Sequence, residues 1–529
     1  MRLVNRRIVP LLALFLAGCA GLPAYNGELD PTVPSVLFVA DPQIHHIYGG
    51  RVKQGTEGAD LFAGVARRHP ETNILAPFAL ESLVKLGEDT KPIAPFMVVL
   101  GDATNAACTA EFDDFVKAVK RGSDKIVLLA HGNHDSYLMG TLNYWQPYDP
   151  SSFKFEKFNV ALLPPDETWW PDFEIKNNED VEGWRGLCFQ NAASSKPMHK
   201  VQWMGKYLKT LEAEIDITAG TEIDAMLSFR ARSKPGRALA GLNYEMLGLW
   251  KRPHGRDLGG LIETYDSFLV QAVDVGALDR LILIDTSACA YLKRAQLWPR
   301  AIWQNHGRHG CMGTAQLTII GSMVQTAIEA GKRIVLAGHF PLDEISGESG
   351  KLLIALMEAK QGKGWTYLSA HTHNEQTRKQ LGTLGTEFNI SSTTDWPSGA
   401  FRVQFGSTMS MFRIAGVETD MQYVAPPAFP TGPELCRHLL AAEYLAAMPV
   451  RPEKRYQSPV ELEQDARCIN DAAGKWTSYE KRLHTALETI RVRMKDEKFR
   501  EQALQIMSAA TKHESKKWSV AKIVGLFVK

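Results

Sequence analysis

Residues 126–135 read IVLLAHGNHD, a short apolar run that leads directly into a group of His, Asn and Asp side chains. A short apolar run beside a glycine is typical of a buried β-strand. Four further runs of this form occupy residues 36–40, 96–100, 334–337 and 367–370, and each ends close to Asp or His. Ligands of open α/β sheets bind outside the carboxyl ends of the strands. The five runs therefore predict an α/β fold with one site at a common edge.

The polar residues that follow the five runs are of types that bind divalent metal ions. They are Asp41, Gln43, Asp102, Asn133, His339, His371 and His373. Two neighbouring ions need a carboxylate that bridges them, with imidazole and amide ligands at the other positions, and we expect Asp102 to be that bridge. Side chains alternate along a strand, so His371 and His373 would share one face. We therefore expect a turn after Ala370 that directs each ring to a different ion.

The order of these blocks resembles the signature of the calcineurin-like metallophosphoesterase superfamily. The matching blocks, all between residues 34 and 425, are Asp41-Pro42-Gln43, Gly101-Asp102-Ala103-Thr104-Asn105, Gly132-Asn133-His134-Asp135, His339 and Ala370-His371-Thr372-His373. The run at 281–284 before Asp285-Thr286, and a helix start at 313–317, fit the same family. Five blocks in order are more specific than any single motif. The resemblance implies a four-layer α/β/β/α sandwich with two mixed sheets.

The same resemblance implies metal-dependent hydrolysis of a small phosphate ester, with a bridging hydroxide as the nucleophile. Whether the substrate is a monoester or a diester stays open, because the motifs serve both. The first ion would bind Asp41, Gln43 and His373, the second Asn133, His339 and His371, with Asp102 shared. His134 would protonate the leaving group or contact the phosphoryl oxygens, with Asp135 orienting its ring.

Gln43 stands where the commonest form of the family has His. An amide oxygen in place of a nitrogen favours Mn2+ or Mg2+ over Zn2+. We expect two divalent ions, Mn2+ first, with Fe, Zn2+ and Mg2+ as alternatives. His45 or His46 could reach the metal or the substrate instead, and Asn105 is a further candidate substrate contact. His131 precedes its block, and a structural role is expected for it.

Each block also has a plain structural interpretation. An Asp after a glycine is a common turn residue, and an isolated His is more often structural than a ligand. The main alternative to an enzyme is a catalytically silent, surface-anchored binding or scaffold protein with the same fold. A metal hydrolase of other substrates is a third hypothesis. Metal content separates the enzyme from the scaffold.

The first residues predict export. Arg2, Arg6 and Arg7 precede an apolar run at 8–16 that is too short to span a membrane. The sequence LAGC at 16–19 resembles a bacterial lipobox, which implies a signal peptide at 1–18, cleavage before Cys19 and acylation of its thiol. Residues 19–33 would tether the protein to the membrane, and Ala20 is compatible with an outer-membrane lipoprotein facing the periplasm. The alternative is an ordinary signal peptide cut nearby.

Cysteine usage agrees with an oxidising compartment. Seven cysteines less Cys19 leave an even number, which predicts disulfides in an exported chain. We expect the pairs Cys289–Cys311 and Cys436–Cys468. The formal net charge of +1 over 529 residues gives no field that would attract nucleic acid.

The catalytic domain is expected at residues 34–425, with a probable insertion at 136–280. Arg237 and Arg256 in that insertion could contact a phosphate, although a solvated basic face is the preferred interpretation. The proline-rich stretch at 426–433 predicts a domain edge, and residues 426–529 predict a mainly helical C-terminal region. The sequence makes no prediction of the oligomeric state.

Overall fold

The computed structural model describes most of the predicted domain and little outside it. The described residues are 30, 32–45, 70–88, 94, 96–135, 198, 200–212, 215–223, 226–233, 244–249, 253–257, 262–265, 268–287, 309–345, 349–361, 365–373, 378–381, 385–394, 399–405 and 409–415, with scattered positions between 446 and 499. Cys19, His46, Arg237, Cys289, Cys436 and Cys468 lie outside them, so the lipid anchor and the disulfide pairs stay predictions. Within the described part, no helix is long and apolar enough to cross a membrane.

The first sheet has five strands in the order β16-β15-β1-β2-β3. Its parallel centre consists of β1 (Ser35–Val39), β2 (Phe96–Val99) and β3 (Ile126–Leu129). The antiparallel hairpin of β15 (Gly399–Phe405) and β16 (Met409–Ala415) adds to the free side of β1. Two helices, α3 (Pro70–Glu88) and α4 (Thr109–Gly122), lie in the connections between the parallel strands, because strands that run in the same direction need a crossover connection.

The second sheet has nine strands in the order β13-β14-β12-β11-β10-β9-β6-β5-β4. Its parallel part consists of β10 (Asp279–Leu283), β11 (Arg333–Ala337), β12 (Trp365–Ser369) and β14 (Gly385–Asn389). The antiparallel strands are β13 (Arg378–Leu381), β9 (Phe268–Val275), β6 (Tyr244–Leu249), β5 (Met226–Ser233) and β4 (Ile215–Ile223). A separate ribbon is formed by β7 (Pro253–Asp257) and β8 (Ile262–Tyr265).

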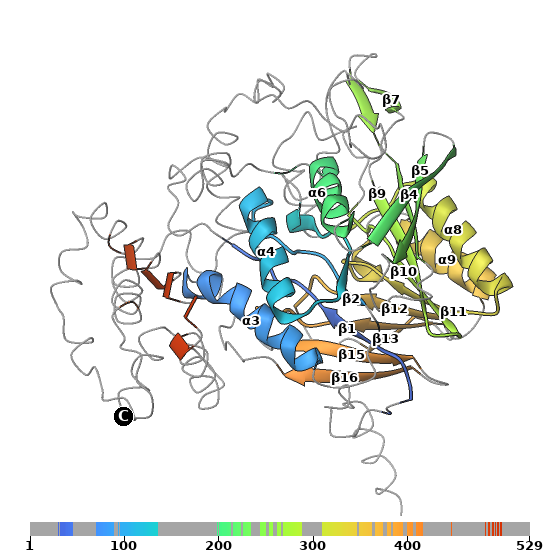
Figure 1. The fold of residues 1–529 in the computed structure, drawn as a ribbon. Helices are drawn as coiled ribbons and strands as arrows, with labels where there is room; N and C mark the ends of the chain where they lie inside the picture. Colours follow the sequence, from blue (N-terminus) through green and yellow to red (C-terminus); the bar gives the residue numbers. More distant parts are fainter. Residues whose placement is uncertain are drawn as a thin grey trace, which may run out of the picture.

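The sheets face each other, and helices cover their outer sides. Figure 1 shows α3 and α4 on one side and α8 (Thr314–Glu329) and α9 (Ser349–Gln361) on the other. Strand β10 shows how the core is divided. Leu281 and Leu283 join the cluster between the sheets, whereas Ile282 joins the cluster under α8 and α9. A strand buried on both faces needs a continuous apolar run. The predicted α/β fold with two mixed sheets is confirmed.

The apolar runs became strands within one or two residues of the predicted bounds, and the helix expected from 313–317 begins at Thr314 with Gly313 as its N-cap. The region predicted as an insertion, residues 136–280, contributes strands to the second sheet. It supplies β9, which pairs with β10, and strands β4 to β6, which extend the same sheet. It also supplies α6 (Lys200–Glu212), which contacts β3 and β4.

Two side chains form hydrogen bonds with the backbone of β3, the edge strand of the first sheet. The hydroxyl of Tyr207 on α6 accepts a hydrogen bond from the amide of Leu129 at 3.0 Å, and Gln271 on β9 donates to the Leu129 carbonyl at 2.9 Å. Unpaired strand edges are prone to pair with other chains. These bonds therefore both protect the edge and join the two sheets beside the site.

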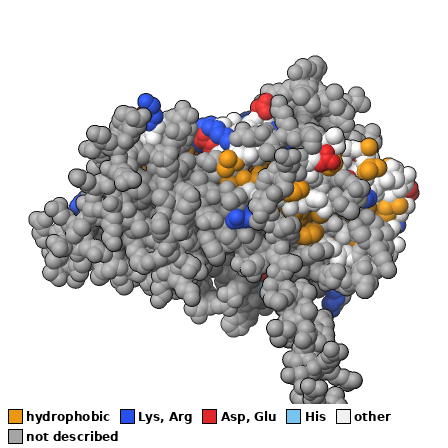
Figure 2. Space-filling view, turned by 90° about the horizontal axis from the view of Figure 1, so that it is seen from below, with side chains coloured by type: hydrophobic (Ala, Val, Ile, Leu, Met, Phe, Trp, Pro, Cys, Tyr) orange, Lys and Arg blue, Asp and Glu red, His pale blue; other side chains and the backbone are white. Residues whose placement is uncertain are grey.

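The outer surface carries charges of both signs. On the face shown in Figure 2, described Lys and Arg side chains lie among Asp, Glu and hydrophobic ones. This mixture agrees with the formal net charge of +1 for the whole chain.

Candidate metal centre

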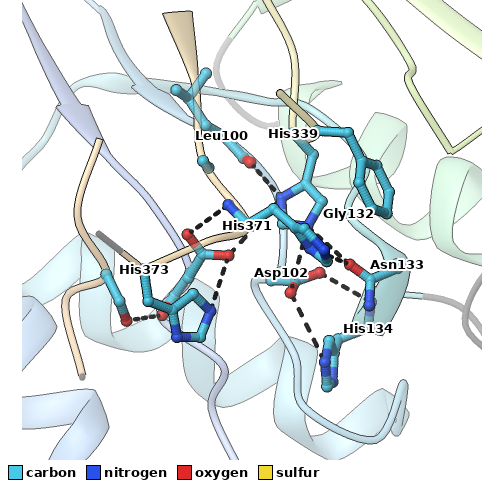
Figure 3. Close-up of polar contacts among 12 residues, drawn as sticks. Leu100, Asp102, Gly132, Asn133, His134, His339, His371 and His373 are labelled. Carbon is cyan, nitrogen blue, oxygen red and sulfur yellow. Dashed lines mark hydrogen bonds and ion pairs between the residues drawn. The ribbon is translucent and has the colours of Figure 1, made fainter. Parts of the chain in front are cut away.

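The carboxyl ends of β1, β2, β3, β11 and β12 bring the predicted ligands into one cluster (Figure 3). Two groups of side chains there could each hold a metal ion. One is Asp102, His339 and His371, and the other is Asp41, Asp102 and His373, with the ligand atoms of each group within 4.8 Å of one another. Asp102 belongs to both groups. It therefore occupies the position that a bridging carboxylate would take.

His339 is oriented as a metal ligand. Its Nδ1 lies 2.9 Å from the carbonyl oxygen of Leu100 (Figure 3). A carbonyl can only accept a hydrogen bond, so Nδ1 carries a proton. In the neutral ring, Nε2 then has a lone pair, and it lies 3.4 Å from Asp102 Oδ2 and 2.8 Å from Asn133 Oδ1. Three acceptors that face one another are what a cation between them would stabilise.

Asp41 supplies an independent test of whether a cation fits. Its Oδ1 is buried and has no hydrogen-bond partner among the described residues, and it lies 3.4 Å from His373 Nε2. Its Oδ2 accepts a hydrogen bond from the amide of His371 at 3.2 Å. A buried carboxylate oxygen without a partner costs free energy unless a cation compensates it. The group of Asp41, Asp102 and His373 therefore fits a metal ion.

Charge favours the same conclusion. Burial raises the pKa of Asp102, but His339, His134 and His371 and the hydrogen bond from Gln43 lower it further, to about 2. The carboxylate is therefore ionised at neutral pH. Burial also lowers the pKa of His371 well below its usual value, and His339 adds to this effect. His371 is therefore a neutral imidazole, the form that binds metals.

The backbone is strained at most of the predicted ligands. Left-handed φ angles occur at Asp41 (47°), Gln43 (39°), Asp102 (52°), His371 (69°) and His373 (57°). Such a conformation costs on the order of 1–3 kcal/mol at a residue other than glycine, and it concentrates at functional sites. Each strand turns sharply at its end and directs a side chain into the cluster. The turn expected after Ala370 is present, since His371 is the first strained residue there.

Two glycines let the loops approach each other. A Cβ on Gly132 would overlap the carboxylate and the amide nitrogen of Asp102. A Cβ on Gly101 would lie 2.8 Å from both Gly132 N and His339 Nδ1, and Gly101 itself has a φ of 89°. The glycines of the two sequence blocks are therefore required by close packing of the loop after β2 against the loop after β3.

His134 lies at the accessible side of the cluster, with 11% of its side chain exposed. Its Nδ1 lies 2.8 Å from the carbonyl of Asn105, so Nδ1 donates and Nε2 points back towards Asp102 Oδ2, 3.9 Å away. The carbonyl of Asn105 therefore contributes to the orientation of the ring.

Asp135 joins two loops. It is buried, and its carboxylate accepts hydrogen bonds from the amides of Thr104 and Gly132, both at 3.0 Å. The pKa of Asp135 is raised well above its usual value by burial and by the charge of Asp102, although these hydrogen bonds act in the opposite sense. The structure thus gives Asp135 a positioning role.

The candidate substrate contacts have different surroundings. His45 is buried, and its Nδ1 lies 2.8 Å from Glu111 Oε1 on α4. The amide of Asn105 is buried, and neither of its polar atoms has a hydrogen-bond partner among the described residues. Arg256 lies in β7, but its side chain is not described. The cluster therefore includes neither His45 nor a described arginine.

Sequence reasoning missed most of the contacts behind the group of Asp102, His339 and His371. The hydroxyl of Thr286 accepts from the amide of Phe340, next to His339, at 2.9 Å, and Ser287 Oγ lies 2.6 Å from Nδ1 of the buried His131. Asp285 pairs with Lys200 on α6 at 2.8 Å. The sequence pattern indicates Asp285-Thr286 after β10, but nothing in the sequence indicates Lys200.

Comparisons with known proteins give distant likenesses to solved structures alone. No family model matches the chain, and no curated protein does either. Among solved structures, the chain is similar to the crystal structure of a dimetal phosphatase from Danio rerio, with a TM-score of 0.34 and 12% sequence identity. The match covers 73% of this chain and 96% of that one. A likeness this distant does not identify an activity, which is inferred below from the chain's own side chains.

Proposed function

We propose that this protein is a phosphoric ester hydrolase that depends on two divalent metal ions. The observation that supports this most strongly is the position of Asp102, which is buried, ionised and shared by two groups of ligands. When bound, the ions would supply Lewis acidity for the phosphoryl oxygens and a water of lowered pKa as the nucleophile.

The described side chains would divide between the two ions. Asp41 and His373 would bind one ion, Asn133, His339 and His371 the other, and Asp102 both. Gln43 Nε2 now donates to Asp102 Oδ2 at 2.9 Å. A half-turn of this amide would bring its oxygen to the same place, where it could bind an ion. Because an amide oxygen is a harder ligand than a nitrogen, we propose Mn2+ as the native metal.

His134 would act on the substrate. Its Nδ1 is held by the carbonyl of Asn105, which leaves Nε2 directed towards the cluster. In the protonated ring, Nε2–H can donate to a phosphoryl oxygen or transfer its proton to the departing alkoxide. The adjacent buried amide of Asn105 could donate to the same substrate.

The test is hydrolysis of p-nitrophenyl phosphate and bis(p-nitrophenyl) phosphate by the full chain with Mn2+. The key variant is Asp102→Asn, which keeps the shape and removes the bridging charge. We expect at least a hundredfold loss of turnover in this variant, together with a loss of bound metal. Asp113→Asn is the matched control, because Asp113 lies on the surface of α4 with 53% of its side chain exposed.

The two outcomes separate the hypotheses. Turnover that requires metal and is lost only in Asp102→Asn supports the proposal, and the preferred ester shows which class to pursue. A wild-type chain that binds no divalent metal and hydrolyses neither ester contradicts the proposal and favours the scaffold alternative.

A further inference from the structure

The segment after β12 that carries the two cluster histidines, residues 370–373, has an unusual conformation. The amide of Thr372 donates to the carbonyl of Ala370 at 2.8 Å, and His371 between them has a φ of 69°. A bond between residues two apart around a positive φ is a strained γ-turn. His373 follows with a φ of 57°. His371 and His373 are therefore both held in backbone conformations that are unfavourable for residues other than glycine.

One buried side chain is bonded to both sides of this turn. Asn389, the last residue of β14, is 1% exposed. Its Nδ2 donates to the Ala370 carbonyl at 2.6 Å and to Ser369 Oγ at 3.1 Å. Its Oδ1 accepts from the Thr372 hydroxyl at 2.8 Å. Since a carbonyl can only accept, the contact with Ala370 fixes which end of the amide is nitrogen.

The magnitudes show that these bonds are large enough to hold the turn. Left-handed conformations at His371 and His373 are each unfavourable. Each net hydrogen bond, and each buried polar group that is paired, is favourable by a similar amount. The bonds of Asn389 are therefore comparable with the strain. Without them, relaxation of the turn towards an extended strand becomes favourable.

The turn decides where the two rings point. His371 Nδ1 lies 3.1 Å from Asn133 Oδ1, in one group, while His373 Nε2 lies 3.4 Å from Asp41 Oδ1, in the other. In an extended strand, residues two apart project from the same face. Relaxation would therefore direct both rings to one side, and one group would lose its imidazole.

We propose that Asn389 and the hydroxyl of Thr372 are a positioning pair that makes the centre dinuclear. The pair keeps His371 and His373 directed to separate ions, and the side chain of Asn389 is bonded to Ser369, Ala370 and Thr372. This inference rests on the proposed function, because it concerns the binding of the second of two ions. Loss of the pair would produce a protein that binds one ion well and the other poorly.

The experiment compares Thr372→Val with Thr372→Ser in the full chain. Valine matches the shape of threonine and lacks the hydroxyl, whereas serine keeps it. Thr386→Val, on β14, makes the same chemical change elsewhere on the strand that carries Asn389. Bound Mn2+ is counted by titration, and the electron paramagnetic resonance spectrum reports whether two ions are close enough to couple.

We expect two bound ions and a coupled spectrum for the wild type, Thr372→Ser and Thr386→Val. In Thr372→Val, we expect the second ion to bind about 10–100-fold more weakly, because groups that orient a metal ligand contribute that much to metal affinity. We also expect the coupled spectrum to disappear. Asn389→Ala should behave in the same way. If it does not fold, the two Thr372 variants still decide the question.

Other results overturn the inference in distinguishable ways. Two tightly bound, coupled ions in Thr372→Val contradict it directly. An equal loss in Thr372→Ser shows that the hydroxyl is not the cause. A wild-type protein that binds fewer than two ions contradicts the proposed function instead, before any variant is compared.

Discussion

The two ends of strand β10 each carry an aspartate in an ion pair, yet they differ in almost every other respect. Asp279 begins the strand and pairs with Arg333 at 2.7 Å, where 37% of the arginine side chain is exposed. Asp285 follows the other end and pairs with Lys200 at 2.8 Å, with 1% of the lysine side chain exposed. One pair is partly solvated at the far edge of the sheet, and the other is buried behind the metal centre.

The two ends of β10 also differ in which residue types have positive φ angles. Near the Asp279 end, positive φ angles belong to Gly276 (62°) and Gly331 (69°), for which they cost little. At the opposite edge, the positive angles belong mainly to Asp, Gln and His. At the Asp279 end of the sheet, the ion pair is partly solvated and the residues with positive φ are glycines. The edge that carries the candidate site keeps buried charge and strain, which the surrounding contacts must hold in place.

The largest expected effect on folding is at the buried pair. Lys200→Met should lower the free energy of unfolding by about 3–5 kcal/mol, because it leaves the carboxylate of Asp285 buried without its cation. Urea denaturation measures the change. Lys200→Met/Asp285→Asn should recover part of the loss, since the uncompensated charge is then removed. A single variant within 1 kcal/mol of wild type would show that the two ends of β10 are energetically alike.

A smaller effect on folding, with a larger one on metal, is expected for Gly132→Ala. The new methyl group would overlap Asp102, and we expect a loss of about 1–3 kcal/mol in stability together with weakened Mn2+ binding. Gly331→Ala is the matched control at the far edge, because a Cβ there meets nothing within 4 Å. It should cost about 1 kcal/mol through its φ alone and leave metal affinity unchanged. Equal Mn2+ affinity in Gly132→Ala and Gly331→Ala would show that close packing at Gly132 does not matter for metal binding.

The smallest effect is expected at the partly solvated pair. Arg333→Met should change the free energy of unfolding by about 1 kcal/mol, because Asp279 is buried but the arginine side chain is 37% exposed, so water can reach the carboxylate once that side chain is shortened. Metal titration should give the wild-type value. A loss as large as that of Lys200→Met would mean that the far edge also depends on its ion pair.

The strands and the ligands could be predicted because their signals are local. A strand buried on both faces must be a continuous apolar run, as at 281–284, and the cluster residues follow such runs directly. Lys200 and Asn389 could not be predicted in this way. Lys200 meets Asp285 across 85 positions, and a single polar residue at a strand end has no periodicity to reveal its partner. The strands of residues 215–275 were missed because their positions in the sheet depend on pairing with β10.

Strand β1 lies between β2 and β15, so its neighbours come from both ends of the domain. Ribosomes release the residues of β1 about 360 residues before those of β15, an interval of tens of seconds at ordinary rates of synthesis. During that interval one edge of β1 has no native partner and can pair with foreign strands. The sheet that carries Asp41 at the end of β1 is therefore complete only after the residues of β15 have been made.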